Sequence, residues 1–167
     1  MRRLKRTFKR PKSPWDMQRI EAEKTIVQTY GLRRKKEIRV AEALLRNFRQ
    51  RARRLIAIVD ESERKKLVAK MQKIGLLKEG AGLDEVLALT VRDVLDRRLQ
   101  TQVFKKGLAL SPKHARQVIV QEHILINGRK VKYPSYMVTV QEEGAITALK
   151  QFERAKIAAP QPAEEGG

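Results

Sequence analysis

Basic and polar side chains gather at the predicted start of a helix near residue 111. Ser111 and Pro112 are typical of an N-cap and of the first helical position. Lys113, Arg116 and Gln117 follow at spacings of three and one, so they share one face of that helix. A helix N-terminus carries partial positive charge, and Lys and Arg bind phosphate oxygens. The cluster therefore predicts a phosphate-binding site.

A second polar group follows a short apolar stretch at residues 124–126, which predicts a strand. The dipeptide Asn127-Gly128 is the strongest two-residue signal for a β-hairpin. Three cations, Arg129, Lys130 and Lys132, lie at or just beyond this turn. Further on, Pro134 favours a bend, and the alternation at residues 136, 138 and 140 predicts a final strand.

Arginines also line a predicted helix within residues 33–59. Its apolar residues lie on one helical face: Leu44, Leu45, Phe48, Ala52, Leu55, Ile56 and Val59. Arg46, Arg49 and Arg53 lie on another face, with Arg54 beside them. A solvated outer face is the alternative. Because few acids are present to pair with these arginines, a phosphate-facing ridge is favoured.

Basic residues are densest before that helix. Residues 1–14 have little to bury, so we expect an extended arm that orders only on a partner; a localisation signal is the alternative. The candidate binding residues of this arm are Arg2, Arg3, Lys5, Arg6, Lys9 and Arg10, and those of the next basic run are Arg33, Arg34, Lys35 and Lys36.

The composition favours a polyanionic partner. Among 167 residues, 38 Lys and Arg stand against 19 Asp and Glu, which gives a formal net charge of +19. Residues 1–54 and 95–140 hold the excess, with net charges of +14 and +7. Anionic membrane is the alternative, but no run of about 20 apolar residues is present. The absence of cysteine indicates a reducing, intracellular setting, so nucleic acid is the favoured partner.

The remaining signals predict mostly helices. Residues 15–30 are predicted to form a helix that stops at Gly31, and residues 61–78 a second helix. The glycines at 80 and 82 predict a loop and a domain boundary. Thr90 and Asp93 resemble a capping box, from which one apolar stripe runs to residue 103 with a stop at Gly107. The fold class is therefore α+β and mostly helical, with helices packed on a short antiparallel sheet.

The stretch "LDRRLQTQVFKKGLALSPKHARQVIVQEHILINGRKVKYPSYMV" at residues 95–138 strongly resembles the S-four-type RNA-binding domain. Residues 1 to about 150 resemble the small-subunit ribosomal protein family that gave the domain its name. The segments "YGLRRKKEIRV", "KIGLL" and "RRLQTQVFKKGLA" are similar to its archaeal and eukaryotic branch. The zinc knot of some bacterial members is not transferable, since this chain lacks cysteine.

The resemblance implies four regions: a basic arm at 1–14, a helical rRNA-binding domain at 15–94, an S-four-type domain at 95–140, and a C-terminal helix with a disordered acidic tail at 141–167. It implies binding to small-subunit rRNA early in assembly, beside neighbouring ribosomal proteins and near where mRNA enters the cytoplasmic ribosome. The implied RNA contacts are Arg97, Arg98, Lys105, Lys106, Ser111, Lys113, Arg116, Gln117, Asn127, Gly128, Arg129 and Lys130.

Two other classes of protein remain open. S-four-type domains also occur in RNA-modifying enzymes and synthetases. Here no nucleotide-binding glycine loop is evident, and His114 and His123 have no helical reason to meet, so we expect no catalytic residue, cofactor or metal. A free RNA chaperone that binds by charge alone is the second alternative. Its binding would collapse with salt and show little preference among RNAs.

Overall fold

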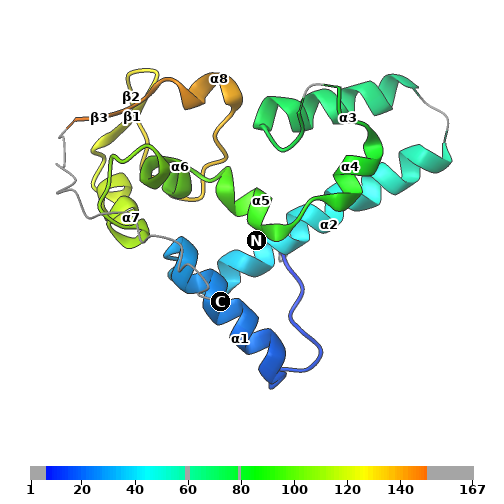
Figure 1. Cartoon of the computed structure of the whole chain (residues 1–167), viewed down its shortest axis with the longest axis horizontal. Helices are drawn as coiled ribbons and strands as arrows, with labels where there is room; N and C mark the ends of the chain where they lie inside the picture. The colour runs from blue at the N-terminus through cyan, green and yellow to red at the C-terminus, as the bar shows by residue number, and fades with distance from the viewer. Residues whose placement is uncertain (1–6, 59–60, 79, 150–167) are drawn as a thin grey trace, which may run out of the picture.

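The computed structural model describes residues 7–58, 61–78 and 80–149 (Figure 1). The elements, in chain order, are α1 (Met17–Tyr30), α2 (Lys36–Ala57), α3 (Glu61–Ile74), α4 (Leu83–Ala88), α5 (Val91–Asp96), α6 (Leu99–Lys105), α7 (Pro112–Val120), β1 (Ile124–Ile126), β2 (Arg129–Lys130), α8 (Val140–Glu143) and β3 (Ile146–Ala148). The fold is α+β and mostly helical, which confirms the prediction.

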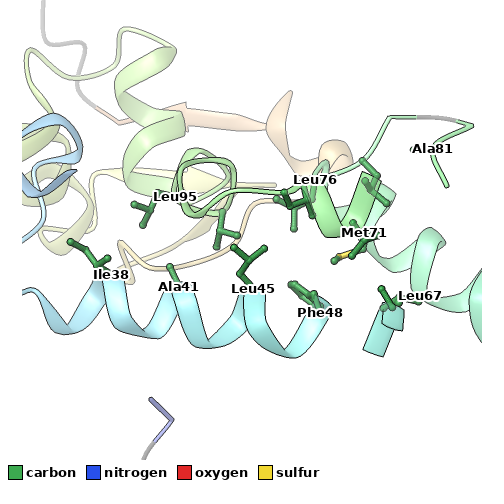
Figure 2. Close-up of a cluster of buried hydrophobic side chains, with 14 of the residues drawn as sticks. Ile38, Ala41, Leu45, Phe48, Leu67, Met71, Leu76, Ala81 and Leu95 are labelled. Atoms are coloured by element: carbon green, nitrogen blue, oxygen red, sulfur yellow. The ribbon is translucent and has the colours of Figure 1, made fainter. Parts of the chain in front are cut away.

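The first hydrophobic core lies along α2. Ala41, Leu45, Phe48 and Ala52 recur at helical spacing on this helix and are all buried. Side chains from α3, α4 and α5 cover that stripe, as Figure 2 shows in part. The covering residues include Leu67, Met71, Val86, Val94 and Leu95.

The second core lies between α6, α7 and a three-stranded antiparallel sheet in the order β2-β1-β3. Leu99, Ile119 and Ile124 are completely buried in it. The sheet begins with the predicted hairpin: Asn127 and Gly128 have φ values of 50° and 75°, and Ile126 pairs with Arg129. Positive φ at both positions is what a two-residue turn of this kind requires, so the hairpin prediction is confirmed.

Two predicted elements differ from the structure. The stripe after Thr90 is not one helix, because Arg98 is extended (ψ 144°) and separates α5 from α6. The predicted strand at 136–140 is wrong: Met137 forms only an isolated bridge with Arg98, and Val140 begins α8. The segment is extended because the start of α6 binds its backbone, with the Leu99 amide donating to the Tyr136 carbonyl at 2.8 Å.

Other local signals are confirmed. Gly31 ends α1 in the left-handed conformation, and Thr90 and Asp93 form the capping box, as predicted. The structure adds that Asp16 caps the start of α1. Ile56, predicted to face inward, is 43% exposed, because it borders an open groove between α3 and α4. A third predicted element also differs: in the region 141–167, predicted as a helix and an acidic tail, α8 ends at Glu143 and residues 146–148 form β3, because they pair with β1. Val59 and the segment 150–167, which includes the predicted acidic tail, lie outside the described residues.

Candidate nucleic-acid interface

The turn after α1 lies directly against the start of α7. Gly31 has a φ of 59°, and a Cβ atom built there would lie 2.8 Å from Pro112 Cβ and 2.9 Å from the backbone nitrogen of Lys113. Glycine permits this close approach and the left-handed conformation. As a result, the exposed side chains of Arg33 and Arg34 follow a turn that packs against the helix carrying the exposed Lys113.

A buried amide fixes this junction. The Nε2 group of Gln100 donates to the carbonyl oxygens of Tyr30, Gly31 and Pro112 at 3.0, 3.0 and 2.9 Å. Gln100 is 3% exposed, so these bonds are shielded from water. Because α1 ends and α7 begins at the same side chain, the two basic segments have a fixed relative position.

A second polar contact joins α2 to the sheet-containing half of the chain. The carboxylate of Glu37 lies 3.2 Å from Arg98 Nη1 and 3.1 Å from Arg116 Nη1. Burial raises the pKa of Glu37, but the hydrogen bond and charge of Arg116 and the charge of Arg98 outweigh it, so the pKa lies below its ordinary value. Arg98 itself is only 9% exposed. Two predicted RNA contacts, Arg98 and Arg116, therefore have an internal partner.

Other predicted contacts near α6 are also paired within the chain. Arg97 Nη1 lies 2.8 Å from Glu143, and the Lys106 ammonium donates to the carbonyl oxygen of the same residue. Lys105 lies 3.1 Å from Asp96 and is about half exposed. Asp96 also affects Tyr30: burial, followed by the nearby charge of Asp96, raises the pKa of the Tyr30 phenol to about 12. Lys105 and Lys106 keep exposed surface for an anion; Arg97 has little.

The clearest unpaired cations lie in a groove along α2. The groove runs between this helix and the segment at residues 7–9, and its walls include Lys9, Arg46, Gln50 and Arg53. Arg46 and Arg53 are exposed and form no ion pair with another described residue. Glu42 is the one acid lining the groove, so its wall carries a positive excess.

The other basic residues predicted on α2 and before it fall into two sets: those that contact another part of the chain and those that are exposed. Arg49 donates to the carbonyl oxygen of Leu89 and so anchors α2 to the end of α4. The Lys36 ammonium lies 5.6 Å from the centre of the Phe8 ring, a cation–π contact, and Lys35 lies 3.5 Å from Glu23.

Arg54 is exposed beside a hollow between α2 and α3. Exposed Arg10 belongs to the predicted arm, whereas Arg2, Arg3, Lys5 and Arg6 lie outside the described residues.

The hairpin presents a further exposed polar group. Asn127, Gly128, Arg129 and Lys130 are all exposed, and no ion pair holds the two cations to another described residue. Lys132 lies 3.9 Å from Glu122. On α7, Gln117 is exposed, while Ser111 caps the helix by accepting from the His114 amide at 3.1 Å. Since Gly31 packs against the start of this helix, an anion reaches the Lys113 side chain more readily than the helix end.

Sequence reasoning missed the residues that hold this surface together. Glu37 is the only acid in the run "RRKKEIRV", and that isolation was the one available signal for an internal ion pair. Gln100 left no signal, because its three acceptors are distant in sequence. Within the described residues, no three His, Cys, Asp or Glu side chains could together hold a metal ion, and no helix is long and apolar enough to cross a membrane.

Sequence comparisons with known proteins indicate the family of this chain. Residues 97–143 match the S4 domain family. The chain is 48% identical over 148 residues to small ribosomal subunit protein uS4 of Ignicoccus hospitalis, covering 87% of this chain and 89% of that protein. It is 45% identical over 164 residues to uS4 of Methanococcus aeolicus, covering 96% and 93%. With uS4 of Nanoarchaeum equitans the identity is 46%, covering 87% of this chain and 84% of that protein.

The fold and its cationic surface define an S4-domain protein adapted to a polyanion. The domain match covers α6, α7, β1, β2 and α8, while the identity extends over the α1 and α2 regions as well. The chain belongs to the small ribosomal subunit protein uS4 family.

Proposed function

We propose that this chain is a structural, non-catalytic protein of the small ribosomal subunit that binds the subunit's rRNA directly. Membership of the uS4 family supports the location in the cytoplasmic ribosome. The proposal includes the finer roles expected from the resemblance: early binding during subunit assembly, contact with neighbouring ribosomal proteins, and a position near the point where mRNA enters.

The observation that carries direct rRNA binding is the groove along α2. Arg46 and Arg53 are exposed and have no acidic partner among the described residues. Each guanidinium is therefore available to bind a phosphate through two parallel hydrogen bonds. Leaving such charges unpaired is unfavourable in a chain with a net charge of +19, and neutralisation by phosphate relieves it.

The proposed interface has two further parts. One is the junction surface formed by Arg33, Arg34 and Lys113, which Gly31 and Gln100 hold in place. The other is the hairpin with Arg129 and Lys130. Because these groups belong to fixed elements of both halves, they can match one folded RNA by its shape as well as by its charge.

Binding of small-subunit rRNA by the full chain tests the proposal. In the variant Arg46→Gln/Arg53→Gln, we expect affinity for a Methanococcus aeolicus small-subunit rRNA transcript to fall roughly ten-fold or more, and the slope of log affinity against log salt to decrease by about two. The matched control is Lys65→Gln/Lys70→Gln, which removes the same charge from α3.

Specificity distinguishes the proposed role from charge-only binding. We expect the wild type to prefer the rRNA transcript to an unrelated RNA of equal length at raised salt, and the α3 control to keep that preference. Equal losses in the two double variants, with no preference between the RNAs, would contradict the proposal and favour the RNA chaperone. A separate experiment, crosslinking within reconstituted subunits, tests the proposed proximity to mRNA.

A further inference from the structure

Trp15 is the only tryptophan of the chain, and it is 85% exposed. It precedes Asp16, the N-cap of α1, at the end of that helix that points away from both hydrophobic cores (Figure 1). An indole ring gains more from burial than almost any other side chain, so this position forfeits a large hydrophobic contribution. None of the cationic groups assigned above accounts for it.

The backbone around Trp15 is held in place on both sides. Before it, Arg19 Nη2 donates to the carbonyl oxygens of Ser13 at 2.8 Å and of Pro14 at 3.0 Å. After it, Asp16 caps α1 by accepting from the backbone amide of Arg19. The exposed ring is therefore attached to an ordered segment rather than to a loose chain, which lowers the entropy lost when a partner binds it.

Arg19 is itself fixed by a buried acid. Its Nη1 atom lies 2.9 Å from Glu23, which is only 6% exposed, and the other carboxylate oxygen of Glu23 lies 3.5 Å from Lys35. Lys35 belongs to the basic turn between α1 and α2. The support of Trp15 is thus linked through two ion pairs to the turn that carries Arg33 and Arg34.

The surroundings of the ring favour a polyanion over an apolar protein surface. Residues 1–16 contain seven basic side chains and one acidic side chain. The acidic one, Asp16, is the helix cap, and Lys9, Arg10 and Lys12 are exposed. A protein partner that covered Trp15 and the exposed Met17 would strip water from nearby cations, which costs free energy unless they find acids. RNA supplies both an aromatic face and phosphates.

We infer that Trp15 is a stacking platform for an unpaired base of the bound RNA. This inference rests on the rRNA-binding function proposed above, and it adds a contact with a base to a surface otherwise made of cations. Indole rings stack on bases of any identity, while the flanking cations bind the phosphates on either side. The contact therefore selects an unstacked nucleotide rather than a particular sequence.

The single tryptophan makes the test direct. Trp15 fluorescence of the full-length protein is measured during titration with the small-subunit rRNA transcript. Stacking is expected to quench the emission strongly. The variant Trp15→Leu should lose roughly ten-fold in affinity for the transcript, whereas Trp15→Tyr should lose little, because only the second keeps an aromatic face. Ile58→Ala, at an exposed apolar residue at the end of α2, is the matched control and should bind like the wild type.

The outcomes separate this inference from the proposed function. If Trp15→Leu binds the transcript as tightly as the wild type while Arg46→Gln/Arg53→Gln binds weakly, the stacking site is wrong and the rRNA interface stands. Emission that stays unchanged at saturating RNA, but shifts to the blue in reconstituted subunits, would overturn it in favour of a protein contact. If the groove variant also binds normally, the proposed interface itself fails.

Discussion

Glu37 and Arg116 are 79 positions apart in the sequence, yet their charged groups lie 3.1 Å apart. Arg98 reaches the same carboxylate at 3.2 Å. One acidic side chain therefore holds the start of α2 against α7 and the segment before α6. The geometry of the proposed RNA surface depends on this contact, because it joins the half that carries the α2 groove to the half that carries the hairpin.

Replacing Glu37 should destabilise the fold. In Glu37→Gln the two guanidinium groups lose their counter-charge, and Arg98, whose side chain is 11% exposed, is left as a nearly buried unpaired cation. We expect a loss of about 2 kcal/mol in the free energy of unfolding, measured with urea. Glu61→Gln breaks an exposed pair with Lys65 and should cost less than about 0.5 kcal/mol. Equal effects would show that the Glu37 contact contributes nothing beyond surface charge.

The same pair should make stability depend on pH. Since the folded-state pKa of Glu37 lies below its ordinary value of 4.5, the unfolded chain binds this proton first as the pH falls. The contribution of Glu37 is therefore complete above pH 4.5 and is lost as the pH drops through the folded-state pKa. Urea unfolding at a series of pH values should show the difference between wild type and Glu37→Gln shrinking in acid. A constant difference would contradict the assigned pKa shift.

Gly31 and Gly128 offer a matched pair of substitutions. Both have positive φ, but a Cβ atom at Gly31 meets Pro112 and Lys113 within 3 Å, whereas one at Gly128 meets nothing within 4 Å. Gly128→Ala should cost about 1 kcal/mol of backbone strain alone. Gly31→Ala adds a clash at the junction and should cost about 2–4 kcal/mol. Thermal unfolding measures both, and similar values would mean that α7 can move away from Gly31 freely.

Leu99 tests the second core. It is completely buried among α6, α7 and the sheet, so Leu99→Ala should leave a cavity and cost roughly 2–5 kcal/mol. Leu110→Ala, at a residue 47% exposed, should cost less than about 1 kcal/mol. Urea unfolding curves give both values. If the Leu110 variant were the less stable of the two, the assignment of the inner face of α6 would be wrong.

Local signals predicted much of this fold. The end of α1, the start of α7, the capping box at Thr90 and the hairpin at Asn127 each depend on residues within four positions of one another. Such contacts can be read from a single stretch of sequence, because the side chain and the backbone group it binds are neighbours. The apolar stripe of α2 was equally clear up to Ala52, but Ile56 is exposed because it borders the open groove between α3 and α4.

The errors arose where distant segments decide the structure. The alternation after Pro134 favoured a strand, but its hydrogen bonds go to the start of α6, and the strand that pairs with β1 on that side is β3. For the same reason the predicted binding residues could not be sorted from sequence alone. Arg98 and Arg46 are both arginines in basic stretches, yet one is enclosed beside Glu37 and the other is open to solvent.

The three hydrogen bonds donated by Gln100 bear on how the protein could distinguish RNAs of different shape. Hydrogen bonds weaken steeply when their angle departs from linear, whereas hydrophobic contacts are non-directional and tolerate small displacements. Because the contact between α1 and α7 depends on such directional bonds, the angle between the two halves of the molecule stays constant. If the proposed interface is correct, the distance between the hairpin and α2 is constant, and we expect an RNA whose grooves have a different spacing to contact only one of the two.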